Sequence, residues 1–117
     1  MSLHSDTEIY KSVCDLAAHC LRAARQMPRD VKLLIGAQLR DETLWMGVLI
    51  LRTNKARDAA KLPHLDELLE HLELVTMMLR MARDLKFIPT KAYADAMPLV
   101  ASIGKQATAL RNHFDPA

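Results

Sequence analysis

The sequence predicts an all-α protein, and three observations support this. Only three of its 117 residues are glycine and five are aromatic, so residues that favour turns and strands are few. Ala, Leu, Met and charged residues that favour helices are abundant. Apolar residues recur every three or four positions along four long segments, which is the period of a helix packed in a bundle. We expect one domain over residues 1–117, an antiparallel up-down-up-down four-helix bundle with a kinked fourth helix.

The first helix is expected over residues 5–27. Ser5 and Glu8 have the spacing of a capping box at its start, and Pro28 ends it. Cys14 and Cys20 are six residues apart and therefore point to different sides of a helix. We expect both to be free, reduced thiols.

The second helix, expected over residues 29–60, contains a run from Leu44 to Leu51 without a polar group. A helix that is apolar on every side is buried on every side, and neighbours within a chain this short can hardly surround it. The run therefore predicts one face for the core and one for another copy or a partner. Gly36 and Gly47 lie inside the same helix. Because an interior glycine costs about 1 kcal/mol relative to alanine, each is expected to allow a close helix contact.

The third helix, expected over residues 63–86, begins with Pro63 in its first turn. It carries one apolar seam along its length and a second seam on a different face of its C-terminal half. Two buried faces again predict a neighbour outside the bundle. The candidate oligomer interface comprises Trp45, Met46, Leu49, Leu74, Met78, Met81 and Leu85.

The fourth helix is expected over residues 90–113, with Thr90 as its N-cap. Pro98 lies within it and removes one backbone hydrogen bond, which predicts a kink. The apolar period continues on both sides of Pro98, so the helix is not expected to end there.

Positive charge gathers where two helices end and the next two begin, since these four termini meet at one end of an antiparallel bundle. This end holds only two acids, Asp30 and Asp84. Its basic residues are Arg22, Arg25, Arg29, Lys32, Arg80, Arg83, Lys86 and Lys91, eight of the sixteen in the chain. Such a field attracts phosphate backbones or an acidic protein. The alternative is a solvated surface with scattered ion pairs. No aromatic residue alternates with these cations, so base stacking is not expected.

Catalytic and metal chemistry find little support in the sequence. A di-iron bundle needs Glu-x-x-His on two helices, and no acid precedes a histidine by three residues. His64, Glu67 and His71 share one face, but the fourth helix supplies no matching histidine within its core. Cys20 adjoins His19, yet neighbours in a helix point about 100° apart. We therefore expect no enzyme activity, no metal and no cofactor. With no secretory signal and no apolar run of about 20 residues, a cytoplasmic protein is expected.

Four short motifs resemble a known family of bacterial four-helix-bundle proteins. They are Met27 to Arg29, Ile35 to Gln38, the leucine-rich segment from Leu65 to Asp84, and Ile103 to Gln106. In that order they resemble the proteins encoded by intervening sequences in ribosomal RNA genes. They also resemble the accessory variability determinants (Avd) of diversity-generating retroelements.

This resemblance implies a barrel-shaped homopentamer without catalytic residues. In the retroelement relatives it implies binding to a reverse transcriptase and to nucleic acid through a basic surface. The expected partners are therefore further copies of the chain and RNA, DNA or a nucleic-acid enzyme such as a reverse transcriptase, with no membrane. Two alternatives stay open: a metal- or small-ligand-binding bundle, and a purely structural scaffold.

Overall fold

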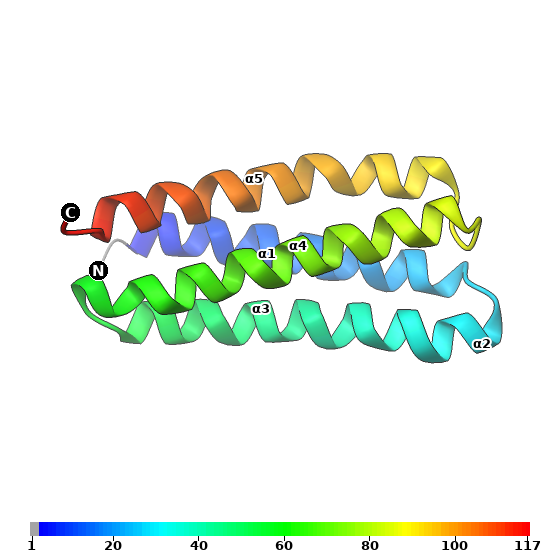
Figure 1. The fold of residues 1–117 in the computed structure, drawn as a ribbon, viewed down its shortest axis with the longest axis horizontal. Coiled ribbons are helices and arrows are strands. Elements are labelled where there is room, and N and C mark those ends of the chain that lie inside the picture. The colour runs from blue at the N-terminus through cyan, green and yellow to red at the C-terminus, as the bar shows by residue number, and fades with distance from the viewer. Residues whose placement is uncertain (1–2) are drawn as a thin grey trace.

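The computed structural model describes the backbone of residues 3–117 and the side chains from Glu8 onward. Four long helices run antiparallel in a bundle with extents of 46 × 23 × 22 Å (Figure 1). They are α1 (Leu3–Arg25), α3 (Ala37–Lys55), α4 (Leu62–Asp84) and α5 (Thr90–Phe114). Helices α1 and α4 each pack against both α3 and α5, so α1 and α4 lie diagonally across the core. The predicted all-α four-helix bundle is confirmed.

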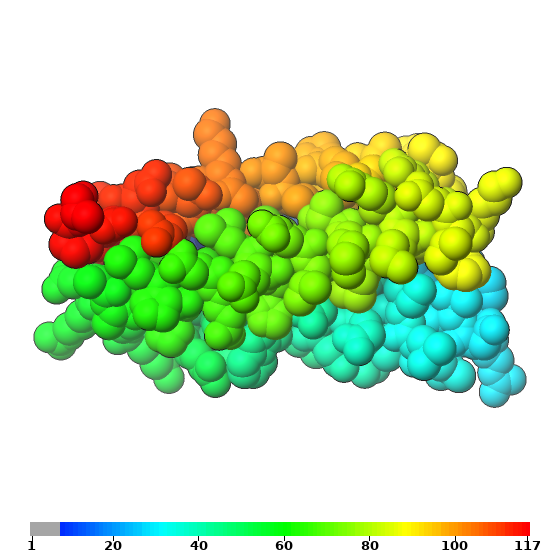
Figure 2. Space-filling view, viewed as in Figure 1, coloured from blue at the N-terminus to red at the C-terminus, as the bar shows by residue number. Residues whose placement is uncertain are grey.

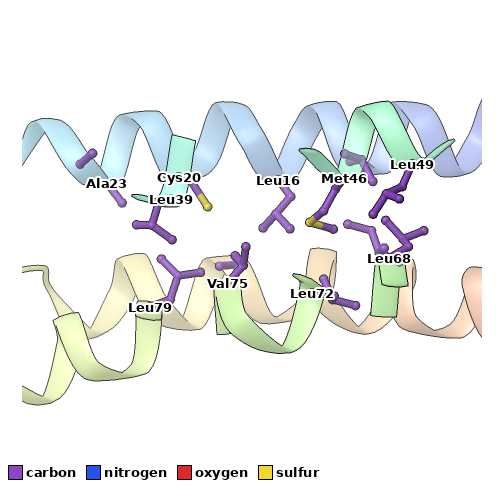
Figure 3. Packing of buried hydrophobic residues seen from close by; sticks show 14 of the residues in the cluster. Leu16, Cys20, Ala23, Leu39, Met46, Leu49, Leu68, Leu72, Val75 and Leu79 are labelled. Carbon is purple, nitrogen blue, oxygen red and sulfur yellow. The ribbon is translucent and has the colours of Figure 1, made fainter. Parts of the chain in front are cut away.

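Leucine, isoleucine, valine and alanine side chains from all four helices fill the core. The seam predicted on α4 is confirmed, since Leu65, Leu68, Val75 and Leu79 are all buried. Figure 3 shows Leu79 and Val75 of α4 pointing towards Leu39 of α3, beside Cys20 of α1. Burial of this apolar surface is the main force that holds the helices together.

The second predicted helix is shorter than expected and changes its winding near its start. It consists of α2 (Arg29–Val31), a π-helical turn η1 (Lys32–Gly36) and α3. The prediction of helix as far as residue 60 is wrong, because the helix ends at Lys55 and the chain enters the 3₁₀ turn η2 (Asp58–Lys61). The Nζ atom of Lys61 donates a hydrogen bond of 2.7 Å to the carbonyl oxygen of Thr53. It takes the place of the amide that a continuing helix would supply.

The interior glycines differ in what surrounds them. A Cβ at Gly36 would lie 3.2 Å from the Cβ of Ala24, which confirms the close contact predicted between α1 and the second helix. A Cβ at Gly47 would meet nothing within 4 Å. The close contact predicted at Gly47 is therefore wrong within one chain, where this glycine lies on the surface.

Two predicted helix starts also differ. Helix α1 begins at Leu3, and the capping box cannot be assigned because the side chain of Ser5 lies outside the described residues. Thr90 is the first residue of α5, and Pro89 occupies the N-cap position without a side-chain cap. The N-cap role predicted for Thr90 is therefore wrong. Helix α5 continues through Pro98, as the unbroken apolar period predicted.

No helix in the described part of the chain carries an apolar stretch long enough to cross a membrane.

Candidate nucleic-acid interface

The eight clustered cations lie at the end of the bundle opposite the two chain termini, where α1 turns into α2 and α4 turns into α5 (Figure 1). We call this set the basic end. Arg83 is half-buried and the other seven side chains are exposed. Two separate turns build it, so the tertiary structure brings together residues from both halves of the chain.

The turn between α1 and α2 contributes four of these cations. Arg22 and Arg25 occupy the last turn of α1. Pro28 then takes an extended conformation (φ −56°, ψ 151°) and starts α2 at Arg29. Lys32 follows in the π-helical turn. The side chains of these four residues make no hydrogen bond or ion pair with the described part of the chain, so their charges face solvent.

The turn between α4 and α5 is a Schellman motif with lysine in the position that usually holds glycine. The amide of Phe87 donates to the carbonyl of Ala82 at 2.7 Å, and the amide of Lys86 donates to the carbonyl of Arg83 at 3.0 Å. Lys86 has a positive φ of 64°. This left-handed conformation is unfavourable for any residue with a Cβ, and it favours glycine. The basic end therefore keeps a cation at a position where the backbone would prefer glycine.

An aromatic side chain lies among the cations. The guanidinium of Arg83 lies over the ring of Tyr93, 4.2 Å from its centre. The Nε atom of Arg80 donates to the Tyr93 hydroxyl at 3.4 Å, and this hydrogen bond raises the pKa of Arg80 above its ordinary value. Tyr93 was not recognised as part of this end, because it does not alternate with the cations along the sequence. Its ring is half-buried and covered by Arg83, so the contact orders two arginines.

Two adjoining grooves cross the basic end. One, of about 400 Å³, separates α1 from the start of α5. The other, of about 540 Å³, lies over the turn between α4 and α5, and both are bordered by Gln26 and Pro89. The first is lined by His19, Arg22, Gln26, Lys91 and Asp95, and the second by Arg83, Lys86 and Thr90.

His19 holds the two sides of the first groove together. Its Nε2 atom is 2.7 Å from the carbonyl oxygen of Ala92. Because a carbonyl oxygen only accepts, Nε2 carries the hydrogen and donates a hydrogen bond from α1 to α5. His19 and Gln26 were missed as residues of this end, although they share a helical face with Arg22 at spacings of three and four. That spacing is the signal that could have found them.

The acids at this end number three among the described residues. Asp84 pairs with Arg83 at 2.8 Å, and Asp95 pairs with Lys91 at 3.0 Å. Asp30 is exposed in α2. The sequence-based count of two acids omitted Asp95, which lies one helical turn after Lys91. The end remains strongly positive, with eight cations against three carboxylates.

The predicted oligomer interface is only partly on the surface. Met46 and Leu49 are completely buried, so the prediction that they contact a partner is wrong. Trp45, Leu74, Met81 and Leu85 are exposed. Met78 is half-buried against the core. The indole N–H of Trp45 donates to Glu67 at 2.9 Å, which ties α3 to α4.

Metal ligands were sought among the side chains from Glu8 onward. Among the described residues, no three His, Cys, Asp or Glu side chains are grouped to hold an ion. His71 pairs with Glu42 of α3 through Nδ1, and its Nε2 lies 3.9 Å from Glu67. The His71–Glu42 contact links α3 and α4, whereas the contact with Glu67 lies within α4. Burial raises the pKa of the Cys20 thiol to about 12, so this thiol stays neutral and is not a nucleophile.

Comparison with protein-family profiles matches residues 8–114 to the family described as bAvd-like. The chain belongs to the bAvd-like family. The resemblance to Avd-like four-helix bundles, predicted from the four short motifs, is confirmed. The match covers most of the bAvd-like bundle, including both turns that carry the basic end. Comparison with curated proteins found no match.

Proposed function

We propose that this bAvd-like protein is a non-catalytic, self-associating bundle whose basic end binds the phosphate backbone of RNA. This proposal rests on the basic end. Eight cations from two turns gather there, and Arg22, Arg25, Arg29, Lys32 and Lys86 form no ion pair with the described residues. Cations without partners are free to displace the counterions of a phosphate backbone, which drives non-specific binding to nucleic acid.

The grooves support backbone binding more than base recognition. They are lined by Arg22, Lys86, Lys91 and the neutral Gln26, side chains that can hydrogen-bond to phosphate oxygens. Two aromatic rings lie at this end: that of Tyr93 has the Arg83 guanidinium over it, and that of Phe87 is half-buried beside the second groove. We therefore expect strong dependence on salt and weak dependence on sequence.

Self-association is supported by large apolar side chains that a single chain leaves exposed. Leu44 and Leu51 lie on the outer side of α3, and Leu74, Met81 and Leu85 lie on that of α4. Exposed apolar residues in such rows mark interaction surfaces. The family resemblance implies a pentamer, which would have five times the chain mass of 13.2 kDa.

Sedimentation velocity at micromolar concentration tests the assembly. We expect a single species heavier than one chain. A protein that remains monomeric under these conditions would refute the proposed self-association.

Binding to single-stranded RNA, measured by fluorescence anisotropy at several salt concentrations, tests the partner. We expect affinity to fall steeply as salt rises. The variant Arg25→Glu with Arg29→Glu should bind more weakly, and its log–log salt slope should decrease by about two, because each lost phosphate contact removes about 0.9.

The matched control is Arg57→Glu with Lys105→Glu, which reverses two exposed cations away from the basic end. It changes the net charge by the same amount as Arg25→Glu with Arg29→Glu. It should bind RNA nearly as well as the unmodified protein. Equal losses for the two variants would mean that total charge, and not the basic end, determines binding. Absence of salt-sensitive binding at low ionic strength would refute the RNA proposal.

A further inference from the structure

One exposed apolar row follows the outer side of α4, and we call it the α4 surface. It consists of Leu74, Met77, Met81 and Leu85, which are 41 to 56% exposed. Figure 2 views the molecule from the side on which α4 lies in front. These residues follow each other at spacings of three and four, so they form one stripe along the helix.

The charges beside the α4 surface are mainly negative. Glu70 is exposed one helical turn before Leu74, Glu73 is exposed directly before Leu74, and Asp84, which pairs with Arg83, is exposed near the end of the row. Arg80 and Lys86 are exposed cations beside the row, and the Nε atom of Arg80 donates to the Tyr93 hydroxyl. The α4 surface is thus an apolar stripe with an acidic margin.

A second apolar surface follows the seam between α1 and α3, and we call it the α1/α3 surface. It consists of Tyr10 and Leu21 of α1 with Leu44 and Leu51 of α3, which are 46 to 60% exposed. Leu44 and Leu51 are seven residues apart and therefore project from the same face of α3.

Gly47 leaves open space within the α1/α3 surface. Gly36 contacts Ala24 across the two antiparallel helices, and this contact sets their register. Gly47 lies three turns further along the same side of α3, which places it level with Cys14 of α1. A Cβ at Gly47 would meet nothing within 4 Å, and Cys14 is exposed. We call the open space at Gly47, between the larger Leu44 and Leu51, the notch.

The charges beside the α1/α3 surface are mainly positive. Arg40 lies one turn before Leu44 and Lys55 one turn after Leu51, and both are exposed. Lys11 is exposed beside Tyr10. Arg40 pairs with its neighbour Asp41 at 3.1 Å, an exposed contact that contributes little. This surface has a basic margin, opposite in sign to that of the α4 surface.

We propose that the α4 surface of one copy packs against the α1/α3 surface of the next copy, in a head-to-tail contact. Each surface is complementary to the other in charge, whereas either surface against itself would bring like charges together. The flexible methionine side chains of α4 can fill the notch at Gly47. Two different surfaces on one chain generate a ring when the rotation between copies closes. This inference rests on the proposed self-association and specifies its contact.

Two variants that each block one surface test the pairing. Met81→Glu with Leu85→Glu blocks the α4 surface, and Leu44→Glu with Leu51→Glu blocks the α1/α3 surface. All four side chains are exposed, so helicity measured by circular dichroism should be unchanged. In sedimentation velocity, each variant alone should be monomeric. An equimolar mixture should form a dimer, because one intact surface of each kind remains.

The outcomes separate the pairing from the self-association. An unmodified protein that assembles, together with a mixture that stays monomeric, would refute the pairing alone. So would one blocked variant that assembles like the unmodified protein, since that would mean a surface packs against its own copy. An unmodified protein that is monomeric would refute both proposals.

A third variant tests the notch without adding charge. Gly47→Leu fills a position that is open in the single chain, and we expect it to raise the concentration needed for assembly at least tenfold. Its control is Ala101→Leu, which adds a similar side chain at an exposed position of α5 outside both surfaces. Equal assembly by the two variants would refute the role of the notch.

Discussion

Gly36 and Gly47 lie three helical turns apart on the same side of one helix, and a methyl group would have opposite effects at the two positions. At Gly36 the added Cβ would approach the Cβ of Ala24 to 3.2 Å, closer than packed side chains tolerate without movement. At Gly47 it would meet no atom within 4 Å. Alanine is the better helix former at both positions, so only the surroundings distinguish them.

We expect Gly47→Ala to raise the free energy of unfolding by about 1 kcal/mol, because alanine is favoured inside a helix. Gly36→Ala should lower it by about 1 kcal/mol, since overpacking between the helices exceeds the gain in propensity. Urea unfolding followed by circular dichroism measures both. The background should carry Met81→Glu with Leu85→Glu, so that self-association does not contribute. Equal stabilisation by the two substitutions would contradict the close contact at Gly36.

Lys86 is the other residue whose conformation conflicts with its side chain. Its φ of 64° suits glycine, so we expect Lys86→Gly to raise the free energy of unfolding by roughly 0.5–1 kcal/mol. The same substitution removes a cation from the basic end and should lower the salt slope of RNA binding by about one.

Lys105→Gly provides the comparison for Lys86→Gly, since Lys105 is exposed in the interior of α5. It should destabilise the helix by about 1 kcal/mol and leave RNA binding nearly unchanged. Unchanged RNA binding by Lys86→Gly would argue against a role for this lysine at the interface.

At the scale of elements, the end of α3 depends on a side chain from the following turn. Lys61 is buried, its Nζ bonds to the Thr53 carbonyl, and the ammonium lies 5.3 Å from the centre of the Phe114 ring. One lysine therefore joins the end of α3, the turn η2 and the end of α5. A lysine ammonium is usually exposed to solvent, but that of Lys61 is hydrogen-bonded inside the fold.

We expect Lys61→Met to lower the free energy of unfolding by about 1–3 kcal/mol, because the aliphatic part is kept while the Thr53 carbonyl loses its buried partner. Lys55→Met, at an exposed position of α3, should change it by less than about 0.5 kcal/mol. Thermal unfolding of both variants measures the difference. Similar stability of the two would show that the Lys61 hydrogen bond contributes nothing.

At the scale of the molecule, the α4 surface adjoins the basic end, because Leu85 lies between Asp84 and Lys86 in the turn after α4. The cations cluster where the two turns lie, whereas the apolar rows run along the sides of the bundle. Cyclic assembly through the sides would direct every basic end to the same face of the ring. RNA that contacted several such ends at once would bind with avidity.

The sequence by itself determined the helical architecture, the inward seam of α4 and the gathering of cations at one end. These follow from local chemistry, because a 3.6-residue period and short connections specify which faces turn inward and which termini meet. The order and spacing of four short motifs, among them Ile35 to Gln38 and Ile103 to Gln106, also indicated the family.

Only the tertiary structure decided which residues of the apolar run from Leu44 to Leu51 face outward. Because every residue in this run is apolar, the sequence does not show which of them face the core. Met46 and Leu49 could be placed there only once α1 and α4 were positioned. The burial of Lys61 and the open space at Gly47 were decided in the same way. Each depends on residues of another element. The pattern of residues along one helix carries no information about them.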